Sequence, residues 1–443
     1  MFPAPFVDDR LQARYQRLVE SHLSPAQRLA CGIRAVPGVS SSAAATQAAY
    51  RFFKNPRVRL RTLVEPLIEA ARAAIPVACD RYVLAVHDWS PLKFRRHHSK
   101  PDRLPVENDK PWKEGYELHT VLLVGDRAGH PLAPVSLSLH AADGVHCSRS
   151  AKVRPALSVL DEHDPAMTFV EWQRLAKPVV HLLDAEADSV AHYRQWSARP
   201  GREYLVRADD RLVEHAGQEV RCSALREQGR EQKTFQRTRE VRYHGRPAEQ
   251  WVMEVAVRLT RPGQQNRPGK SKARVPGPPL DLRLIISEVR NAAGEVLAVW
   301  YLLTNVSRSV DAATIALWYY WRWRVESYFK LLKSAGLELE RWQQESAEAL
   351  ARRLVVASMA CVVVWQLARS EHPEAEPARQ LLIQLSGRQM AYGKRFTEPA
   401  LLAGLWILLA TLHTLENYDL DTLRRIASLV LPNPRAGPAS ELV

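Results

Sequence analysis

One carboxylate stands among cationic side chains in the segment from Trp318 to Trp342. The segment has no proline, and its only glycine, Gly336, falls where the end of a helix is expected, so the sequence predicts a helix. At 3.6 residues per turn, an arc of roughly 80° holds Glu326 together with Tyr319, Arg322, Lys330 and Lys333. A carboxylate in these surroundings is suited to holding a metal ion beside the phosphates of a nucleic acid.

The same segment has a second, apolar arc, which we expect to pack against a core. Its members are Trp318, Trp321, Val325, Phe329 and Leu332. The plainer interpretation of the charged arc is a solvated helix face with ordinary ion pairs between successive turns. The segment alone does not separate the two interpretations, so partners elsewhere in the chain are needed.

Two further acids follow short apolar runs. The run 82–86 leads into His87 and Asp88, and the run 179–183 ends at Asp184. The end of a buried strand in an α/β layer is a frequent position for a catalytic carboxylate. Glu186 and Asp188 follow closely, but the strand-end position favours Asp184, and either of the other two would serve as a cap for the next helix.

Three carboxylates suit phosphodiester chemistry, because hard cations need oxygen ligands. Two Mg²⁺ ions about 3.5–4 Å apart activate the attacking oxygen and stabilise the leaving oxygen; Mn²⁺ is expected to substitute. We therefore expect Asp88, Asp184 and Glu326 to be the catalytic residues and the metal ligands, with Asp88 shared by both ions. A lone acid at a strand end is common, so the hypothesis depends on all three.

The composition favours a polyanionic partner. The 443 residues carry a net charge of +14, and the cationic residues recur along the whole chain rather than in one tail. A merely basic soluble protein is the alternative, and no basic amphipathic anchor points to a membrane surface.

Five scattered cysteines suggest neither disulfides nor a structural zinc site. The apolar stretches 354–367 and 401–412 are too short to span a bilayer, so we expect a cytoplasmic protein without a membrane partner.

The elements that must position these residues follow from apolar periodicity. We predict strands at 82–87, 118–124, 132–139, 179–184 and 204–208, in the order of an RNase H-like core. Four more strands at 239–243, 251–259, 282–289 and 299–303 form a β-rich insertion at about 211–305, with a mobile Pro/Gly loop at 261–279. The expected domains are N-terminal helical (1–75), α/β catalytic (76–370) and C-terminal helical (378–443).

The spacing of Tyr319, Arg322, Glu326 and Lys333 reproduces the YREK pattern of bacterial cut-and-paste transposases. The chain resembles the insertion-sequence-four family of these enzymes over most of its length. The segment 49–56, Ala-Tyr-Arg-Phe-Phe-Lys-Asn-Pro, is also similar to one that closes the N-terminal domain of that family. Two features depart from the pattern: Trp89 replaces the usual small hydroxyl residue after the first aspartate, and the N-terminal region is shorter.

The resemblance implies a DDE triad of Asp88, Asp184 and Glu326 that cleaves double-stranded DNA at the transposon ends through a hairpin intermediate and joins the 3′ ends to target DNA. It also implies DNA and phosphate contacts by Tyr319, Arg322, Lys330, Lys333, Arg207, Arg51 and Lys54, and a flipped base stacked beside Trp300. A homodimer in the synaptic complex, held by the C-terminal domain, and an association with the bacterial nucleoid are implied as well. The alternatives are a catalytically silent DNA-binding relative and a host nuclease with an RNase H-like core.

Overall fold

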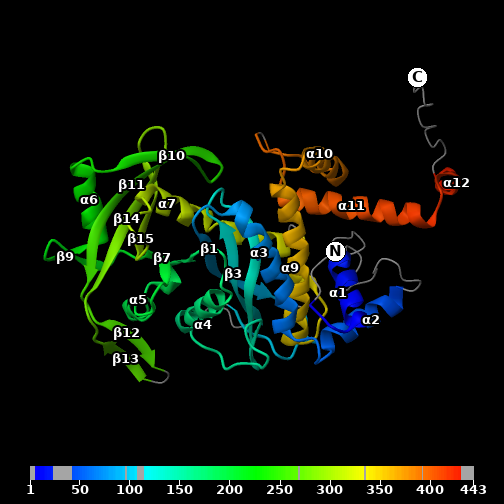
Figure 1. The fold of residues 1–443 in the computed structure, drawn as a ribbon, viewed down its shortest axis with the longest axis horizontal. Helices are drawn as coiled ribbons and strands as arrows, with labels where there is room; N and C mark the ends of the chain where they lie inside the picture. Colours follow the sequence, from blue (N-terminus) through cyan, green and yellow to red (C-terminus); the bar gives the residue numbers. More distant parts are fainter. Residues whose placement is uncertain are drawn as a thin grey trace.

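A computed structural model of the protein arranges the chain around one large, twisted sheet (Figure 1). The structure describes residues 5–22, 42–94, 97–106, 114–267, 270–333, 336–391 and 393–430. Parts of the predicted N- and C-terminal domains (1–4, 23–41 and 431–443) therefore lie outside the described residues. In Figure 1 the β-rich part lies at the left and the N- and C-terminal helices lie at the right.

The main path of the sheet runs β5-β4-β3-β1-β6-β7-β15-β14-β11-β8-β9. Its first half contains β1 (Val83–Lys93), β3 (Glu114–Gly125), β4 (Pro131–Ala141), β5 (Gly144–Cys147), β6 (Val179–Leu183) and β7 (Glu203–Ala208), with the short β2 (Leu104–Pro105) paired to β3. The strand β1 pairs antiparallel with β3 and parallel with β6, and β6 pairs parallel with β7. The five strands expected at 82–208 are thus present as neighbours.

The strand β1 is longer than the sequence predicts. Its parallel pairing with β6 ends at Val86 and Leu182, but its antiparallel pairing with β3 continues to Lys93 and Gly115. Asp88 therefore lies within the strand, opposite Thr120, and not at its end. Asp88 and Asp184 each come two residues after the last parallel pair, Val86 with Leu182. The two aspartates therefore lie at the same edge of the parallel part of the sheet.

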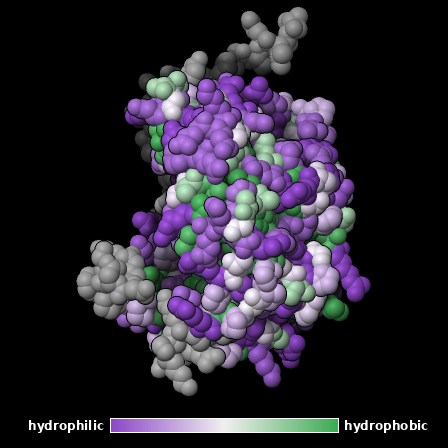
Figure 2. Space-filling view, turned by 90° about the vertical axis from the view of Figure 1, so that its left-hand side faces the viewer, coloured by the Kyte–Doolittle hydropathy of each residue, from purple (hydrophilic) through white to green (hydrophobic). Residues whose placement is uncertain are grey.

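The β-rich insertion extends the same sheet, because β15 pairs antiparallel with β7. It contains β8 (Leu212–His215), β9 (Gln218–Arg221), β10 (Gln236–Tyr243), β11 (Arg246–Leu259), β14 (Leu280–Arg290), β15 (Val296–Thr304) and the helix α6 (Cys222–Glu231). The loop expected at 261–279 is instead largely a two-stranded hairpin, β12 (Gly263–Arg267) and β13 (Lys270–Val275). Figure 2, which faces this end of the molecule, shows a mostly hydrophilic surface with a smaller apolar area in its middle.

Helices cover the first half of the sheet. The long helices α3 (Leu60–Ala78) and α9 (Ala347–Arg369) pack against β4 and against each other. Their apolar residues join the strands in one core that continues into the N- and C-terminal helices. The remaining helices here are α4 (Val159–Trp172), α5 (Val190–Ser197), α7 (Ala312–Trp321) and α8 (Arg324–Leu332), with short 3-10 turns η2 (Ala185–Ala187) and η3 (Leu339–Arg341).

The terminal helices are attached to α9. At the N-terminal end α1 (Asp9–His22) and α2 (Ser42–Lys54) contact it, and a buried guanidinium at Arg352 donates a 2.6 Å hydrogen bond to the Phe53 carbonyl. At the C-terminal end α10 (Ala375–Ser386) and α11 (Glu398–Asn417) contact it, and α12 (Leu420–Val430) follows.

The expectation that the apolar stretch 401–412 is too short to span a bilayer needs correction. The stretch 401–412 is part of a helix of 20 residues, which is long and apolar enough to cross a membrane by length and composition alone. Leu401 and Leu402 are nevertheless buried, and α11 packs against α10.

The four described cysteines are free and buried, while Cys31 lies outside the described residues.

Candidate active site

Asp88 projects from β1 into a largely enclosed position, where it is 8% exposed. One oxygen accepts a 2.9 Å hydrogen bond from the backbone N–H of Trp89. The other accepts a 3.0 Å bond from Nη1 of Arg322. The carboxylate is thus held by one neutral donor and one charged donor.

Asp184 lies directly after β6 and is the N-cap of η2, since its side chain accepts a 2.8 Å bond from the N–H of Ala185. The Tyr319 hydroxyl donates a 3.1 Å bond to its Oδ1, and Arg207 forms an ion pair with the same oxygen. Nη2 of Arg322 lies 2.8 Å from Oδ2. Neighbouring Asp188 points elsewhere: it accepts a 2.7 Å bond from the Tyr193 hydroxyl and forms part of a separate network.

Arg322 joins the two aspartates, because one guanidinium contacts Asp88 through Nη1 and Asp184 through Nη2. This arrangement depends on a break in the helix predicted at 318–342. The structure has two helices there, α7 and α8, separated by Arg322 and Trp323. The N–H of Arg322 donates to the Tyr319 carbonyl and that of Val325 to the Arg322 carbonyl, which is the tighter i→i−3 pattern.

Glu326 lies in the first turn of α8 and is exposed. Burial raises the pKa of Asp88 to about 7; the Arg322 guanidinium opposes this rise, and the negative charges of Glu326 and Glu186 add to it. Glu326 therefore acts electrostatically on the same site as Asp88.

Glu186, on η2, is a fourth carboxylate of this site, whereas the sequence favoured a capping role for it. Its side chain keeps contact with solvent, yet surrounding protein atoms desolvate the carboxylate and raise its pKa, and the charge of Asp184 adds to that rise. The acidic spacing Asp-x-Glu after the apolar run was the sequence signal for it.

The cations of the predicted charged arc differ in their surroundings. Nζ of Lys333 donates hydrogen bonds of 2.7 Å to Ser90 Oγ and 2.6 Å to the Pro91 carbonyl, and it lies 4.0 Å from Glu340. Burial lowers the pKa of Lys333. Lys330 is exposed on α8. The structure thus anchors Lys333 to β1 just past Asp88 and leaves Lys330 facing solvent.

Trp300, on β15, lies beside the site. Its ring meets the Tyr319 ring edge-to-face with a centroid distance of 5.6 Å, and Tyr319 in turn contacts Asp184. Trp300 also lines a cavity of about 360 Å³. The other lining residues are Arg242, Tyr243, His244, Tyr320, Trp321, Trp323, Arg324 and Ser327.

The two N-terminal cations lie far from the carboxylates along the chain. Arg51 and Lys54 are both exposed on α2. Nζ of Lys54 forms a 2.7 Å ion pair with Glu345, just before α9. Arg51 and Lys54 therefore belong to the surface of the N-terminal helices and not to the carboxylate cluster.

The donor set fits hard divalent cations. Asp88 and Asp184 contact the two ends of one guanidinium, so their carboxylates lie side by side, and the charges of Glu326 and Glu186 act on Asp88. Oxygen-only donors of this kind are the ligands that Mg²⁺ takes in proteins. Arg322 neutralises the aspartates in this arrangement.

Family comparison agrees with this chemistry. Residues 80–363 match the model of the transposase DDE domain. The chain belongs to this family. Residues 3–58 match a second model, transposase DNA-binding. A comparison with curated proteins found no significant match. As a DDE transposase the protein cuts and joins DNA, DNA is its partner, and the family generally uses divalent metal ions.

Proposed function

We propose that this DDE transposase is a cut-and-paste enzyme of the insertion-sequence-four family, similar to the transposon-five transposase. It would cleave transposon ends through a hairpin and join the 3′ ends to target DNA. The observation that carries the proposal is the bridge from Arg322 to Asp88 and Asp184, with Tyr319 on the same aspartate. Three members of the YREK pattern thereby act at this site: Arg322 on both aspartates, Tyr319 on Asp184 and the charge of Glu326 on Asp88.

The strand order supports an RNase H-like core. Three antiparallel neighbours, β4, β3 and β1, are followed by two strands parallel to β1, namely β6 and β7. We retain the domain division at 1–75, 76–370 and 378–443 as part of the proposal, with 211–305 as an insertion that extends the core sheet.

We assign Asp88, Asp184 and Glu326 as the metal ligands, with Glu186 beside them. When bound, two Mg²⁺ ions activate the attacking oxygen and stabilise the leaving one. Ligand binding of this kind needs ionised carboxylates. The protein's own part is to hold the two aspartates at one sheet edge and to bring Glu326 to them on α8.

The cations have a second role in this proposal. If bound metal ions neutralised the aspartates, the Arg322 guanidinium would be free to contact a DNA phosphate, whose geometry suits a planar donor fork. Arg207, which is half-exposed, and Tyr319 leave Asp184 for the same reason. Lys330 faces solvent and needs no such release, while Lys333 contacts phosphate next to β1.

The aromatic cavity beside Trp300 supports the hairpin step. A hairpin requires the strand to bend sharply, and an unstacked base is stabilised by stacking on an aromatic ring by about 1–3 kcal/mol. The cavity is lined by five Trp and Tyr rings, and Arg242 and Arg324 are available to contact the DNA backbone. We place the flipped base there.

The terminal parts complete the assignment. Arg51 and Lys54 would contact phosphates of the transposon end, which sets affinity more than sequence choice. The exposed leucines Leu412, Leu415 and Leu429 on the C-terminal helices suit a homodimer in the synaptic complex. A cytoplasmic protein associated with the bacterial nucleoid follows from a DNA substrate.

The test is cleavage of a linear DNA that carries the inverted repeats flanking the gene. With Mg²⁺ we expect double-strand breaks whose transposon ends are covalently closed hairpins, visible on denaturing gels. Open ends without hairpins would reject the hairpin mechanism. Binding without cleavage by the wild-type protein in Mg²⁺ and in Mn²⁺ would favour the silent relative, and cleavage independent of the repeats would favour the host nuclease.

The raised pKa of Asp88 predicts a pH dependence. With a pKa of about 7, Asp88 is roughly nine-tenths ionised at pH 8 and one-tenth ionised at pH 6. At limiting Mg²⁺ we expect cleavage to fall roughly tenfold between pH 8 and pH 6, and excess Mg²⁺ to restore it, since the metal competes with the proton. Mg²⁺ titrations at both pH values check this, with DNA binding measured alongside. An identical Mg²⁺ requirement at both would contradict it.

A further inference from the structure

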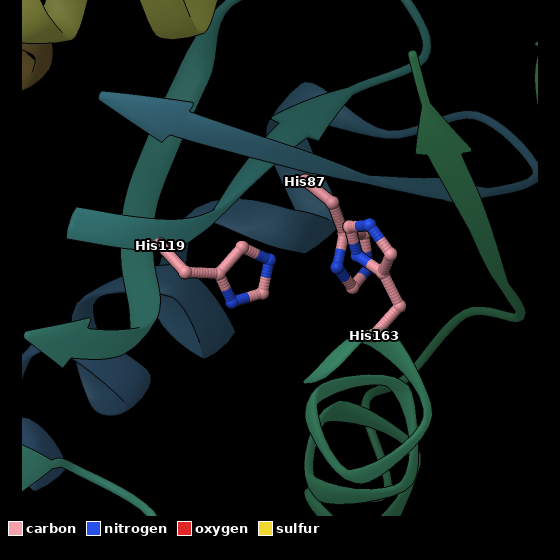
Figure 3. Close-up of side chains that lie close together, drawn as sticks. All are labelled: His87, His119 and His163. Carbon is pink, nitrogen blue, oxygen red and sulfur yellow. The ribbon is translucent and has the colours of Figure 1, made fainter. Parts of the chain in front are cut away.

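Four histidines lie together inside the catalytic part, apart from the carboxylate site. His87 on β1, His119 on β3, His163 on α4 and His181 on β6 are each 0% exposed. The rings of the first three have centroid distances of 5.7, 5.5 and 5.3 Å (His87–His119, His87–His163 and His119–His163). Figure 3 shows the two strand histidines and the helix histidine pointing toward one another.

The strand register separates this cluster from Asp88. Successive side chains of a strand point to opposite faces of the sheet. His87 is paired with Val121, and Trp89 with His119, so His87 and His119 share a face and Asp88 lies on the other. The contacts agree: Asp88 meets Arg322, whereas His87 meets His163 and His181.

Most ring nitrogens of His87, His119 and His163 have no hydrogen-bond partner among the described residues. Among the residues that the structure describes, Nδ1 of His87 and both ring nitrogens of His119 and His163 are buried without a hydrogen-bond partner. A buried polar atom left unpaired costs about 1–3 kcal/mol. These five atoms form one group of unpaired nitrogens that a bound ion would satisfy.

We propose that His87, His119 and His163 bind a first-row transition-metal ion, with Zn²⁺ as the ion that fits best. One ring nitrogen from each of the three lies within 4.8 Å of the others. Nitrogens around a tetrahedral Zn²⁺ lie about 3.3 Å apart, so small side-chain rotations close the site. A water molecule would be the fourth ligand.

The surroundings of His87 support a metal ligand. Its Nε2 lies 3.0 Å from Nδ1 of His181, and Nε2 of His181 lies 3.4 Å from a carboxylate oxygen of Glu171. If His87 donates its Nε2–H to His181, its unpaired Nδ1 keeps a lone pair that is available to a metal ion. Metal-binding histidines commonly donate their other N–H to such a relay.

Nearby charges are compatible with a cation. Arg149 is close to the cluster, but it forms an ion pair with the buried Glu162 on α4, and Arg202 is paired with Glu171 and Asp164. Burial lowers the pKa of His163 to about 3, so its imidazole is neutral, which is the ligating form. Trp89 covers the cluster, with its ring 4.8 Å from that of His119.

The ion would tie α4 to β1 and β3, on the face of β1 opposite to Asp88. It would be structural, and it does not depend on the function proposed above. Soft or borderline ions prefer imidazole, whereas the carboxylate site prefers Mg²⁺. The two sites are therefore separable by ion type.

The experiment measures Zn²⁺ in purified full-length protein after dialysis against excess Mg²⁺. We expect one equivalent per chain in the wild type and less than about a tenth of that in His119→Leu and His163→Leu. Asp184→Asn with Glu326→Gln, which alters the carboxylate site, and His146→Gln, a buried histidine on β5, should keep the full equivalent. Loss in the carboxylate variant with retention in the histidine variants would overturn the proposal.

A second measurement needs no variant. Wild-type protein stripped by a chelator should gain about 3 °C or more in Tm when Zn²⁺ is returned, because binding to the folded state stabilises it. Co²⁺ returned in its place should give visible absorption bands typical of a tetrahedral nitrogen site. A wild type that holds no Zn²⁺ and shows neither response would overturn the proposal, whether or not the leucine variants fold.

Discussion

Glu326→Gln is expected to reduce strand cleavage by about 10³-fold or more while leaving DNA binding unchanged. The substitution keeps the size of the side chain but removes the charge that acts on Asp88. Loss of one metal-binding carboxylate removes several kcal/mol of transition-state stabilisation, and each 1.36 kcal/mol is a factor of ten in rate. Single-turnover cleavage and an electrophoretic binding assay on the same DNA check this.

The matched control is Glu338→Gln, which alters a carboxylate paired with the exposed Arg341 shortly after α8. It should cleave at the wild-type rate. If Glu326→Gln also cleaved normally, the assignment of Glu326 as a metal ligand would be wrong. If it lost DNA binding, the substitution would be acting on the fold or on the DNA contact surface instead.

Arg322→Ala is expected to destabilise the metal-free protein by about 3–5 kcal/mol, because it leaves two neighbouring carboxylates in an enclosed site without their shared counter-ion. The Arg322 side chain is 8% exposed, and those of Asp88 and Asp184 are 11% and 15% exposed, so solvent screens the loss only weakly. Added Mg²⁺ should restore much of this stability. Denaturant unfolding in chelator and in Mg²⁺ measures both effects.

The same variant should form hairpins about 10²-fold more slowly even at saturating Mg²⁺, since a charged donor to the phosphate is missing. Arg341→Ala, which removes only a surface ion pair, should change stability by less than about 1 kcal/mol and leave hairpin formation unchanged. Arg322→Lys should recover only part of the stability, because one ammonium does not bridge both aspartates as a guanidinium fork does. An unchanged hairpin rate in Arg322→Ala would remove Arg322 from the phosphate-binding group.

The sequence predicted the strands of the catalytic part well because their apolar runs are bounded by turn residues. The end of β1 was predicted too early, because the extra residues of the strand are held by long-range contacts, namely pairing with β3 and hydrogen bonds from Lys333. The break between α7 and α8 has neither glycine nor proline to announce it. There the ion pairs of Arg322 with Asp88 and Asp184 compensate for the interrupted helix. Ion pairs between residues so far apart in the chain cannot be predicted from the local sequence.

The histidine cluster could not be predicted at all. His87, His119 and His163 lie 76 positions apart from first to last and show no ligand spacing. Only the register of β1 with β3, and the packing of α4 on that face, bring them together. By contrast, the sequence signal for Asp88 and Asp184 is local, because both follow runs of buried aliphatic residues, and the structure places the two side by side.

The two faces of β1 leave this strand little evolutionary freedom. A shift of one position would exchange His87 with Asp88, placing a carboxylate among buried imidazoles and an imidazole against the Arg322 guanidinium. Single-residue insertions or deletions between Val83 and Asp88 should therefore be purged from descendants of this gene. Length changes in the exposed turn at Gly217, between β8 and β9, should persist. A comparison of where descendants tolerate insertions and deletions would thus identify β1 as the strand whose two faces are both constrained.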